Sequence, residues 1–461
     1  MHSKAARRRR AGPGGAGARC GMRRAPFSVA VQKGAIMQTI TITGGHTLHG
    51  TIRPAAAKNS VLPLLAATLL CGGPCCLRGV PDLADVDTSL ALLQAVGAGA
   101  SRHGPDLCTL PIPAAALCGE IPPALAGAMR SSVFYLAPLL CRAGMVRLPL
   151  PGGCRLGPRP VDIHLAGLAA MGAQVELEGE AVTLRRFGPL RGTDFTLRLP
   201  SVGATATLLM AACCAMGTTV LRGAACEPEV CDLARFLRAC GAQITGEGTP
   251  VIVVRGRQTL NGVAYTPVPD RIAAATYAAA VAAAGGQITV NGCAPRYYRA
   301  FLDFLQSCGV EVRPGADTVE LARDPDRPLR GGQHLYANAW PAFATDTAPL
   351  AAAVLLEAEG PSEIYDHLFA NRFSCAEGFA AMGADCTARG RMLRIAGGAR
   401  LHSARVTAPD LRGGAALLVA ALAARGTTVL RDPGHIRRGY ADLPGDLARL
   451  GGQCIRQQAG E

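Results

Sequence analysis

The sequence predicts a mixed α/β protein built from six repeats of a small unit of about 70 residues. One phrase, a leucine-containing run that ends on glycine, recurs along the chain at spacings of 75, 69, 68, 74 and 68 residues. A second phrase, an alanine- and leucine-rich run followed by glycine and a short strand-like run, precedes each copy of the first. The glycines of the first phrase are Gly97, Gly172, Gly241, Gly309, Gly383 and Gly451.

Each unit is predicted to contain, in order, a helix, a strand, a helix and two strands. The runs 211–216 and 416–425 are typical of buried helices, and the glycines after them, Gly217 and Gly426, suit left-handed caps. The alternating residues 218–221 then indicate a half-buried strand. Six such units suggest two domains of three. A solenoid also fits the period, but units of this length with two helices are long for one.

Composition narrows the class of protein and locates its charge. The chain has 461 residues, 49% hydrophobic and 17% charged, which excludes a small disulfide-stapled module, a disordered chain, a collagen and a coiled coil. The formal net charge is +14, yet residues 1–36 hold nine basic and no acidic side chains. We expect this extension to be disordered. It is either an incidental stretch before Met37 or a basic arm for nucleic acid.

The cysteines and histidines do not suggest a metal site. Eighteen cysteines without a secretory signal favour a reducing compartment, and hence a cytoplasmic location. The adjacent pairs Cys75-Cys76 and Cys213-Cys214 fit small core residues better than a disulfide framework. There is no Cys-x-x-Cys, and the nine histidines are not spaced as metal ligands. The longest apolar runs, 204–220 and 272–284, are rich in Ala and are expected to be buried helices and not membrane spans.

Polar residues interrupt the apolar pattern where each alanine-rich helix starts. A helix start presents free backbone N–H groups and a partial positive charge, so cations placed there would form anion pockets. Capping alone would explain Ser201, Asp270 and Asp410, but not Lys58 or Arg130. The six helix-start segments are Lys58-Asn59, Arg130-Ser131, Ser201-Val202-Gly203, Asp270-Arg271, Thr345-Asp346 and Asp410-Leu411-Arg412.

Six cations at matched places in four of the six units predict a compact, highly charged ligand. They are too dispersed for a basic stripe along a nucleic acid, whereas Arg side chains bind carboxylate and phosphate groups in bidentate fashion. For any single arginine, a solvated surface position is an equally good explanation. The six residues are Lys58, Arg130, Arg159, Arg372, Arg412 and Arg438.

Among the eighteen cysteines, Cys154 is the best candidate for chemistry. It lies in the loop 151–162, which contains three Gly and three Pro and need not pack in a core. Most other cysteines sit in apolar runs. Nearby arginines would lower the pKa of the Cys154 thiol, and a bound dianion would raise it again, which would restore a protonated donor.

With these motifs in place, the chain resembles the UDP-N-acetylglucosamine 1-carboxyvinyltransferase family over about residues 37 to 457. A Lys-Asn pair alone would be a weak signal, but the ordered set is specific. The motifs are Ala57-Lys58-Asn59-Ser60, Asp85-Val86-Asp87-Thr88-Ser89, Met129-Arg130-Ser131-Ser132, Pro151-Gly152-Gly153-Cys154, Gly157-x-Arg159-Pro160-Val161-Asp162-x-His164, Ser201-Val202-Gly203-Ala204-Thr205, Glu227-Pro228-Glu229, Pro269-Asp270-Arg271-Ile272, Pro341-Ala342-Phe343-x-Thr345-Asp346, Asn371-Arg372-Phe373, Asp410-Leu411-Arg412 and Arg438-Gly439-Tyr440.

The resemblance implies a two-domain inside-out α/β barrel that closes over its substrates. The first domain would comprise residues 37–57 plus 269–461, the second residues 58–268, and the chain would cross between them near residues 57 and 269. The implied reaction joins phosphoenolpyruvate to the 3-hydroxyl of UDP-N-acetylglucosamine and releases phosphate, as the first committed step of peptidoglycan synthesis. It needs no metal or organic cofactor. A monomer without a membrane span or bound nucleic acid is expected.

The resemblance also assigns roles to individual residues. Cys154 matches the family's proton donor, which is the thiol that fosfomycin alkylates, and Asp346 matches the carboxylate that faces the sugar hydroxyl. Lys58 and Arg438 match catalytic residues as well. The implied phosphoenolpyruvate ligands are Lys58, Asn59, Arg159, Arg372, Arg412 and Arg438. The implied UDP-sugar ligands are Arg130, Arg159, Pro160, Val161, Asp162, Ile163, Pro200, Ser201, Val202, Asp346 and Leu368.

Several positions depart from the family pattern. Leu199 stands where relatives often have a Lys, which affects one nucleotide contact, and Ala56, Ala273 and Arg437 replace a Gly, an acidic residue and an Asp. Two alternatives therefore stay open: the related transferase of the shikimate pathway, and a catalytically silent relative that binds a sugar nucleotide. The first lacks the Gly-Gly-Cys loop, and the departure at Leu199 is the best support for the second.

Overall fold

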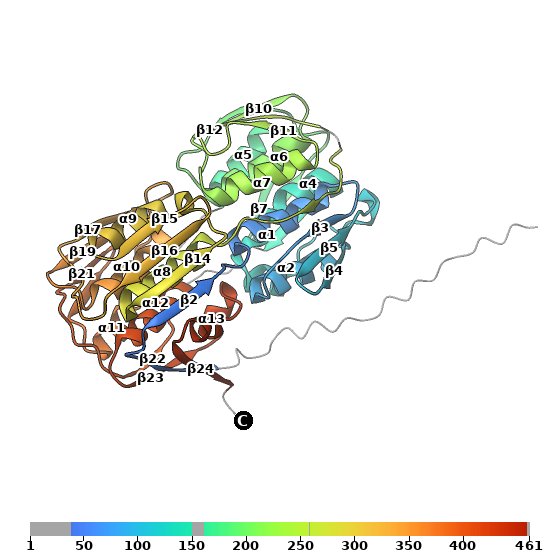
Figure 1. Ribbon diagram of the computed structural model, residues 1–461. Helices are drawn as coiled ribbons and strands as arrows, with labels where there is room; N and C mark the ends of the chain where they lie inside the picture. Colours follow the sequence, from blue (N-terminus) through green and yellow to red (C-terminus); the bar gives the residue numbers. More distant parts are fainter. Residues whose placement is uncertain (1–37, 150–160, 258, 459–461) are drawn as a thin grey trace, which may run out of the picture. The chain divides into compact units, whose positions relative to one another are not determined.

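The computed structural model describes residues 38–149, 161–257 and 259–458, and in them the strands form six sheets (Figure 1). Each predicted unit therefore has its own sheet, and the mixed α/β class is confirmed. In hydrogen-bonded order the sheets are β13 (Ala264–Tyr265), β3 (Cys75–Leu77), β5 (Asp106–Leu110) and β4 (Gly99–His103); β6 (Met145–Pro149), β8 (Ala181–Arg185) and β7 (Gln174–Glu178); β11 (Gln243–Thr245), β12 (Val251–Arg255), β10 (Thr218–Arg222) and β9 (Asp194–Thr196); β15 (Glu311–Pro314), β16 (Thr318–Arg323), β14 (Gly286–Asn291) and β2 (Leu48–Ile52); β18 (Phe343–Ala344), β17 (His334–Asn338), β19 (Ser362–Asp366), β21 (Met392–Ile395) and β20 (Cys386–Arg389); and β22 (Arg405–Thr407), β23 (Thr427–Asp432), β1 (Gln38–Thr43) and β24 (Gln453–Gln458).

Each unit also has one buried helix before its central strand and a more exposed helix after it. The buried helical segments are α1 (Lys58–Ala67), η3 (Arg130–Tyr135) with α4 (Leu136–Ala143), α6 (Val202–Cys214), α8 (Arg271–Ala284), η5 (Thr345–Thr347) with α10 (Ala348–Leu355), and α12 (Leu411–Ala423). The second helices are α2 (Ala84–Ala95), α5 (Asp162–Ala170), α7 (Pro228–Ala239), α9 (Arg299–Ser307), α11 (Ala376–Ala381) and α13 (Leu443–Arg449). Short additions are η1 (Thr68–Leu70), η2 (Ala114–Ala116), α3 (Pro123–Ala128), η4 (Pro295–Tyr297) and η6 (Ile436–Arg438).

The glycines that carry the sequence repeat end the second helix of each unit. All six have φ between +91° and +102°, a region that favours glycine because it has no Cβ. In the first unit the N–H of Ala98, one residue beyond, donates to the carbonyl of Leu93 at 2.8 Å. Gly217 and Gly426, which follow buried helices, have φ of +90° and +87°. The predicted left-handed positions are confirmed, and they explain why the glycines recur at a fixed period.

Strands from distant parts of the chain complete three of the sheets. β1 lies between β23 and β24, antiparallel to both, and takes the place that β12 has between β10 and β11. β2 pairs in parallel with β14, and β13 pairs in parallel with β3. The segments after β2 and β13 meet in a bridge between Ala56 and Pro269. The predicted crossing points near residues 57 and 269 thus lie side by side.

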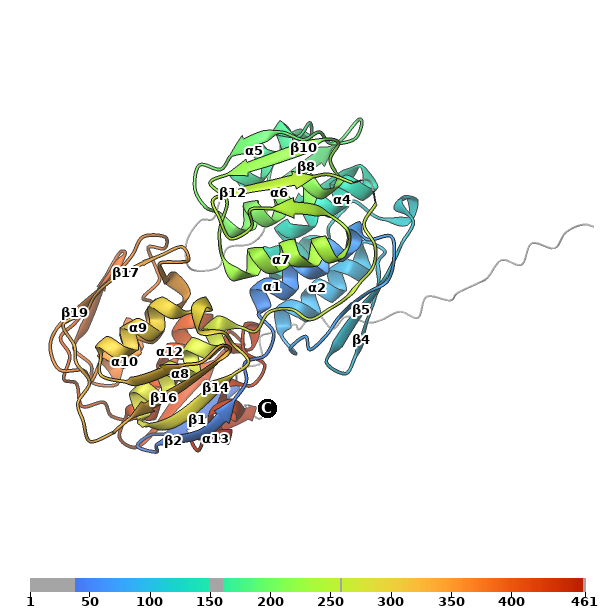
Figure 2. The same ribbon diagram turned by 45° about the horizontal axis from the view of Figure 1, so that its top comes forward.

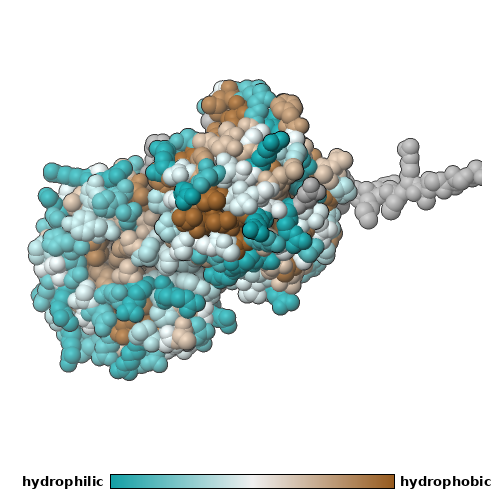
Figure 3. All heavy atoms as spheres, turned by 90° about the horizontal axis from the view of Figure 1, so that it is seen from above, coloured by the Kyte–Doolittle hydropathy of each residue, from teal (hydrophilic) through white to brown (hydrophobic). Residues whose placement is uncertain are grey.

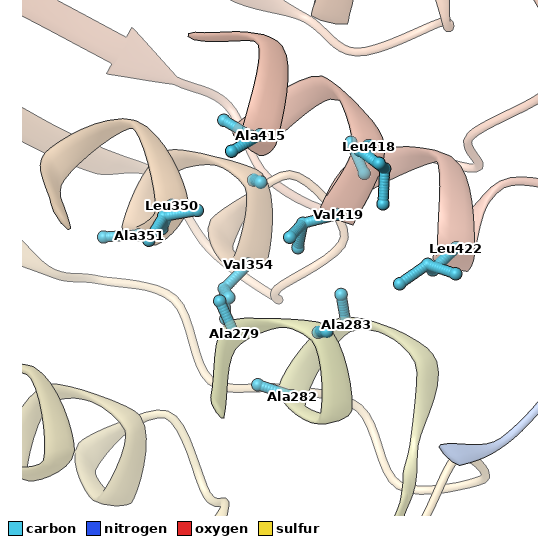
Figure 4. Packing of buried hydrophobic residues seen from close by; sticks show 14 of the residues in the cluster. Ala279, Ala282, Ala283, Leu350, Ala351, Val354, Ala415, Leu418, Val419 and Leu422 are labelled. Carbon is cyan, nitrogen blue, oxygen red and sulfur yellow. The ribbon is translucent and has the colours of Figure 1, made fainter. Parts of the chain in front are cut away.

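Two hydrophobic clusters form the cores of the two α/β domains. One draws on residues 40–52 and 273–454, and the other on residues 61–260. In the first cluster α8, α10 and α12 pack against one another (Figure 4). Their contact surfaces are mostly Ala and Val with a few Leu, so the helices can approach closely and the sheets can lie outside them. The contact residues labelled in Figure 4 are Ala279, Ala282, Ala283, Leu350, Ala351, Val354, Ala415, Leu418, Val419 and Leu422.

Hydrophobic residues on the surface are scattered. Figure 3 shows, on the face it presents, mostly hydrophilic and neutral residues with small separate hydrophobic patches. The apolar runs that could have suggested membrane spans are the buried helices α6 and α8, as predicted. Across the described part of the chain, no helix combines the length and the apolar composition that crossing a membrane requires.

Candidate functional site

A buried carboxylate, Asp85, binds two of the predicted cations. Lys58 is the first residue of α1, whose preceding residue Ala57 offers no side-chain cap. Its Nζ lies 3.1 Å from Asp85 Oδ2, and Arg438 Nε donates to Asp85 Oδ1 at 2.9 Å. The side chain of Asp85 is only 7% exposed. Asp85 thereby links Arg438, 353 residues away in the sequence, to Lys58 at the start of α1. The first N–H groups of such a helix have no partner within the helix.

The pKa values in this cluster show how strongly the charges are coupled. Burial raises the pKa of Asp85, but Lys58 and Arg438 outweigh it, so the pKa lies below its ordinary value. Burial lowers the pKa of Lys58, Asp85 raises it, and the guanidinium groups of Arg412 and Arg438 lower it further, with a net decrease. Lys58 is therefore a buried cation under repulsion, which an added anion would relieve.

A second carboxylate, Asp346, lies between two more of the predicted cations. Asp346 Oδ1 is 3.4 Å from Arg372 Nη1 and 3.5 Å from Arg412 Nε. Arg372 Nε also donates to Thr345 Oγ1 at 2.9 Å, and the hydroxyl of Thr345 donates in turn to Asp366. Arg372 is 1% exposed, and its Cζ lies 4.6 Å from the ring centroid of Phe369. Both guanidinium groups are thus held in place from several sides.

In each arginine one buried nitrogen makes no hydrogen bond with the described part of the chain, although that of Arg372 lies 3.4 Å from Asp346 Oδ1. The Nη1 atoms of Arg372 and Arg412 are buried, and neither has a hydrogen-bond partner among the described residues. Asp346 raises the pKa of Arg412 above its ordinary value even though burial opposes this. Because Arg412 also acts on Lys58, the Asp346 and Asp85 clusters lie within electrostatic reach of each other. Buried guanidinium donors without partners are costly, and an anionic oxygen would satisfy them.

A third set of charges adjoins Asp346. Arg271 binds Glu229 with two contacts, Nε to Oε1 at 3.0 Å and Nη2 to Oε2 at 3.4 Å, and both side chains are less than 10% exposed. Asp346 and Glu227 also raise the pKa of Arg271. Glu227 Oε2 is buried without a hydrogen-bond partner in the described residues, and burial raises the pKa of Glu227 to about 7.

Several of the residues predicted to bind the sugar nucleotide lie at the starts of α5 and α6. Ser201 caps α6 by accepting from the N–H of Ala204. Asp162, in the first turn of α5, pairs with Arg198 at 2.6 Å. A Cβ on Gly203 would lie 2.9 Å from His164 Nε2, so the two helix starts touch. Burial, helped by the charge of Arg130, lowers the pKa of His164 to about 4.

The structure brings together some of the predicted residues and leaves others apart. Lys58, Arg372, Arg412, Arg438 and Asp346 belong to the linked clusters. Of the described residues predicted for the nucleotide, Asp346 belongs to these clusters, Leu368 adjoins them through Asp366, and the others lie at the starts of η3, α5 and α6. Arg130 acts on His164, Val161 and Ile163 flank Asp162, and Pro200 and Val202 flank Ser201. Leu368 is 41% exposed and donates its N–H to Asp366, and Asn59 is half-buried beside Lys58. Cys154, Arg159 and Pro160 lie outside the described residues.

Four carboxylates of the site received no role from the sequence: Asp85, Glu227, Glu229 and Asp366. Asp85 lies within one of the quoted motifs, and Glu227 and Glu229 lie in another, while Asp366 is the last residue of β19 and belongs to none. Asp366 Oδ1 accepts from the N–H groups of Leu368 and Phe369 and so shapes the turn before Arg372. A signal was available for Asp85, whose motif falls at the start of α2, and for Glu227 and Glu229, whose motif falls at the start of α7. The pairing of Asp85 with Arg438 spans 353 residues.

Chemically, the arrangement suits a small ligand with two anionic groups. Lys58 and Arg438 form one cationic group, and Arg372 and Arg412 form the other. The carboxylate of Asp346, 28% exposed, adjoins the second group and can accept a proton from a neighbouring hydroxyl. Among residues 38–149, 161–257 and 259–458, no group of three or more His, Cys, Asp or Glu side chains could hold a metal ion.

Comparisons with known proteins point to one family. Residues 42–447 match the family model described as EPSP synthase (3-phosphoshikimate 1-carboxyvinyltransferase). The chain is 41% identical over 422 residues to UDP-N-acetylglucosamine 1-carboxyvinyltransferase 1 of Symbiobacterium thermophilum, with 90% of this chain and 94% of the relative covered. It is 39% identical over 421 residues to UDP-N-acetylglucosamine 1-carboxyvinyltransferase 2 of Caldanaerobacter subterraneus, with 91% and 100% covered.

A solved structure agrees with these relatives. The crystal structure of the enolpyruvyl transferase NikO from Streptomyces tendae superposes with a TM-score of 0.81 at 28% sequence identity. The superposition covers 92% of this chain and all of that one. The resemblance therefore extends over both α/β domains and is not confined to one of them.

Proposed function

Because the chain belongs to the family of UDP-N-acetylglucosamine 1-carboxyvinyltransferases, we propose that it transfers the enolpyruvyl group of phosphoenolpyruvate to the 3-hydroxyl of UDP-N-acetylglucosamine. Phosphate is released. The single observation that carries this proposal is the pair of buried guanidinium groups of Arg372 and Arg412, which both face Asp346 and whose Nη1 atoms make no hydrogen bond within the described residues. The carboxylate of phosphoenolpyruvate would bind to these two guanidinium groups, next to Asp346, which would face the sugar hydroxyl.

The two cationic groups match the two ends of phosphoenolpyruvate. Lys58 and Arg438, together with Arg159, would neutralise the phosphate, and Arg372 and Arg412 would bind the carboxylate in bidentate fashion. Asn59, beside Lys58, would contact either substrate. A dianionic phosphate would raise the pKa of Lys58, which repulsion from Arg412 and Arg438 now lowers, and would keep Lys58 protonated. This electrostatic clamp is expected to be the largest contribution to catalysis.

The chemistry needs one acid and one base. Cys154 would donate a proton to the methylene carbon of phosphoenolpyruvate while the sugar oxygen adds to the adjacent carbon, and Asp346 would take the hydroxyl proton. Removal of a proton from the new methyl group would then expel phosphate and restore the enol ether. Fosfomycin would alkylate Cys154. Turnover should be lost in Cys154→Ala, whereas Cys154→Asp, which supplies another acid, should keep part of it and resist fosfomycin. Full activity of the Ala variant would rule out the acid role.

The sugar nucleotide would bind across the starts of α5 and α6. Arg130, Arg159 to Ile163 and Pro200 to Val202 would contact the nucleotide, with Leu368 and Asp346 toward the sugar. The product would enter peptidoglycan synthesis, so the enzyme would serve cell wall formation, cell shape and cell division. We also propose a cytoplasmic location, which the eighteen cysteines favour.

One assay separates this function from its alternatives. Phosphate release from phosphoenolpyruvate is measured with UDP-N-acetylglucosamine, with shikimate 3-phosphate, and with neither. Release that depends on the sugar nucleotide is expected. Release with shikimate 3-phosphate instead would favour the shikimate-pathway enzyme, and nucleotide binding without any release would favour a silent relative.

A further inference from the structure

Three buried thiols gather at the ends of α1 and α7, away from the charged clusters. Cys71 follows η1, Cys75 begins β3, and Cys240 caps the C-terminus of α7. They are 1%, 2% and 0% exposed. Cys71 Sγ lies 3.6 Å from Cys240 Sγ and donates its S–H to it. Cys75 contributes to the pKa values of both, so the three thiols form one cluster.

A small pocket leads to this cluster. It has a volume of about 10 Å³, room for one molecule of about the size of water, and is lined by Cys71 together with Thr68, Thr109, Ile112 and Leu117. Thr109 lies on β5 directly opposite Cys75 on β3. A molecule close to water in size, such as hydrogen peroxide, could therefore reach Cys71, although the residue itself is almost fully buried.

The thiols and the charged site occupy opposite ends of the same helix pair. Near their starts, Ser60 of α1 donates to Asp232 of α7, and beyond their ends Cys71 contacts Cys240. The two helices therefore run side by side in the same direction, as Figure 2 also shows. Lys58 begins the first of them.

We propose that Cys71 and Cys240 are a redox modification site, at which a small peroxide that enters the pocket forms a reversible disulfide. One thiol attacks the peroxide oxygen, the O–O bond breaks, and a sulfenic acid and one water result. The second thiol then displaces the hydroxyl as a second water, and the S–S bond forms. Two thiols lose two electrons and two protons, and one hydrogen peroxide is reduced to two waters. A dithiol reductant reverses the change.

The geometry sets what this disulfide requires. An S–S bond is about 2.05 Å long, so the sulfurs must approach by about 1.5 Å, a shift within reach of side-chain rotation and a small helix displacement. Hydrogen bonds to Cys240 and Cys75, together with burial, raise the pKa of Cys71. The reaction is therefore expected to be slow at neutral pH and faster as the pH rises, because the thiolate is the nucleophile.

The test uses the full chain treated with hydrogen peroxide, alkylated, and digested without reductant. Mass spectrometry should find a peptide that joins Cys71 to Cys240, formed before other cysteine pairs and lost on addition of dithiothreitol. Because the bond closes a loop between residues 169 apart, oxidation should also raise the unfolding temperature. Cys240→Ala and, independently, Cys71→Ala should abolish both effects.

The matched control is Cys308→Ala. Cys308 is likewise buried, but no other thiol of the described residues contributes to its pKa. This variant should form the Cys71–Cys240 peptide and show the same temperature rise as the parent. The proposal is overturned if no such peptide forms, if other pairs form with equal yield, or if either cysteine variant keeps the temperature rise.

Discussion

The carboxyl group of Glu227 should make the stability of this protein fall as the pH rises through the neutral range. Glu227 is 7% exposed, and its Oε2 has no hydrogen-bond partner in the described part of the chain. Burial raises its pKa from the ordinary 4.5 to about 7, against the opposing effects of its own backbone, Arg271 and a backbone hydrogen bond from Trp340. Glu229 adds to the increase.

The sign follows from proton binding. Below about pH 4.5 Glu227 is protonated in both the folded and the unfolded chain. Between 4.5 and about 7 the unfolded chain loses this proton while the folded protein keeps it, so unfolding becomes easier as the pH rises. At 1.36 kcal/mol per pKa unit, the whole interval corresponds to a loss of about 3 kcal/mol, complete above pH 7.

Replacement of Glu227 by Gln removes the titration and keeps the size of the side chain. Glu227→Gln should match the parent near pH 4.5 and exceed it by up to about 3 kcal/mol at pH 8. Urea unfolding midpoints of both proteins, measured from pH 5 to 8, give the difference. Other titrating groups change both proteins alike. Asp303→Asn, which removes an exposed ion pair with Arg299, is the control. Its unfolding free energy should stay within about 0.5 kcal/mol of the parent value at every pH. A Glu227→Gln advantage that is absent at pH 8, or equal at pH 5 and pH 8, would refute the argument.

Three further substitutions, with Gly127→Ala as a control, test other parts of the protein. Asp85→Ala leaves Lys58 and Arg438 without their shared carboxylate and should cost about 3 kcal/mol of unfolding free energy. Inorganic phosphate should then raise the unfolding temperature more in the variant than in the parent, and equal increases would contradict this. Gly203→Ala places a Cβ 2.9 Å from the buried ring of His164 and should cost about 1–3 kcal/mol. Gly127→Ala in α3 meets nothing within 4 Å and should be neutral or stabilising in the same thermal melts. Arg198→Ala removes the cation beside Leu199 and should raise the KM for UDP-N-acetylglucosamine about two- to fivefold, with the KM for phosphoenolpyruvate unchanged. An unchanged KM for the nucleotide would exclude Arg198 from its binding.

The parts of the fold that local rules govern could be predicted from the sequence. A glycine with positive φ follows the second helix of every unit, so the repeat period and the unit order could be predicted directly. Ser201, Asp270 and Asp410 cap their helices as their residue types suggest. Each of these features depends on neighbours within four residues.

The pairings between distant segments could not be predicted in this way. Nothing in β1 indicates that it completes the sheet of β23 and β24, because an alternating strand pairs equally well with many partners. The same holds for the bond between Asp85 and Arg438, and for the burial of Glu227, which depends on packing between segments far apart in sequence. The positions of the cations could be predicted, but not the carboxylates that hold them.

The six units repeat the same helix start, but only three of the six starts have a side-chain cap. This difference explains how one repeated fold forms a site with two cationic groups. Three buried helices, α6, α8 and α12, have their first N–H groups satisfied by the side chains of Ser201, Asp270 and Asp410. The other three segments, α1, η3 and η5, start after Ala57, Met129 and Ala344, which offer no such cap. Their free N–H groups and partial charge favour an anion, and it is there that Lys58, Arg130 and Asp346 stand. At α12 the cap has another effect: because Asp410 accepts from the backbone N–H of Arg412, the guanidinium group is left to meet Asp346. The six repeats supply equivalent positions, and the loss of a cap at three of them adapts those positions to binding.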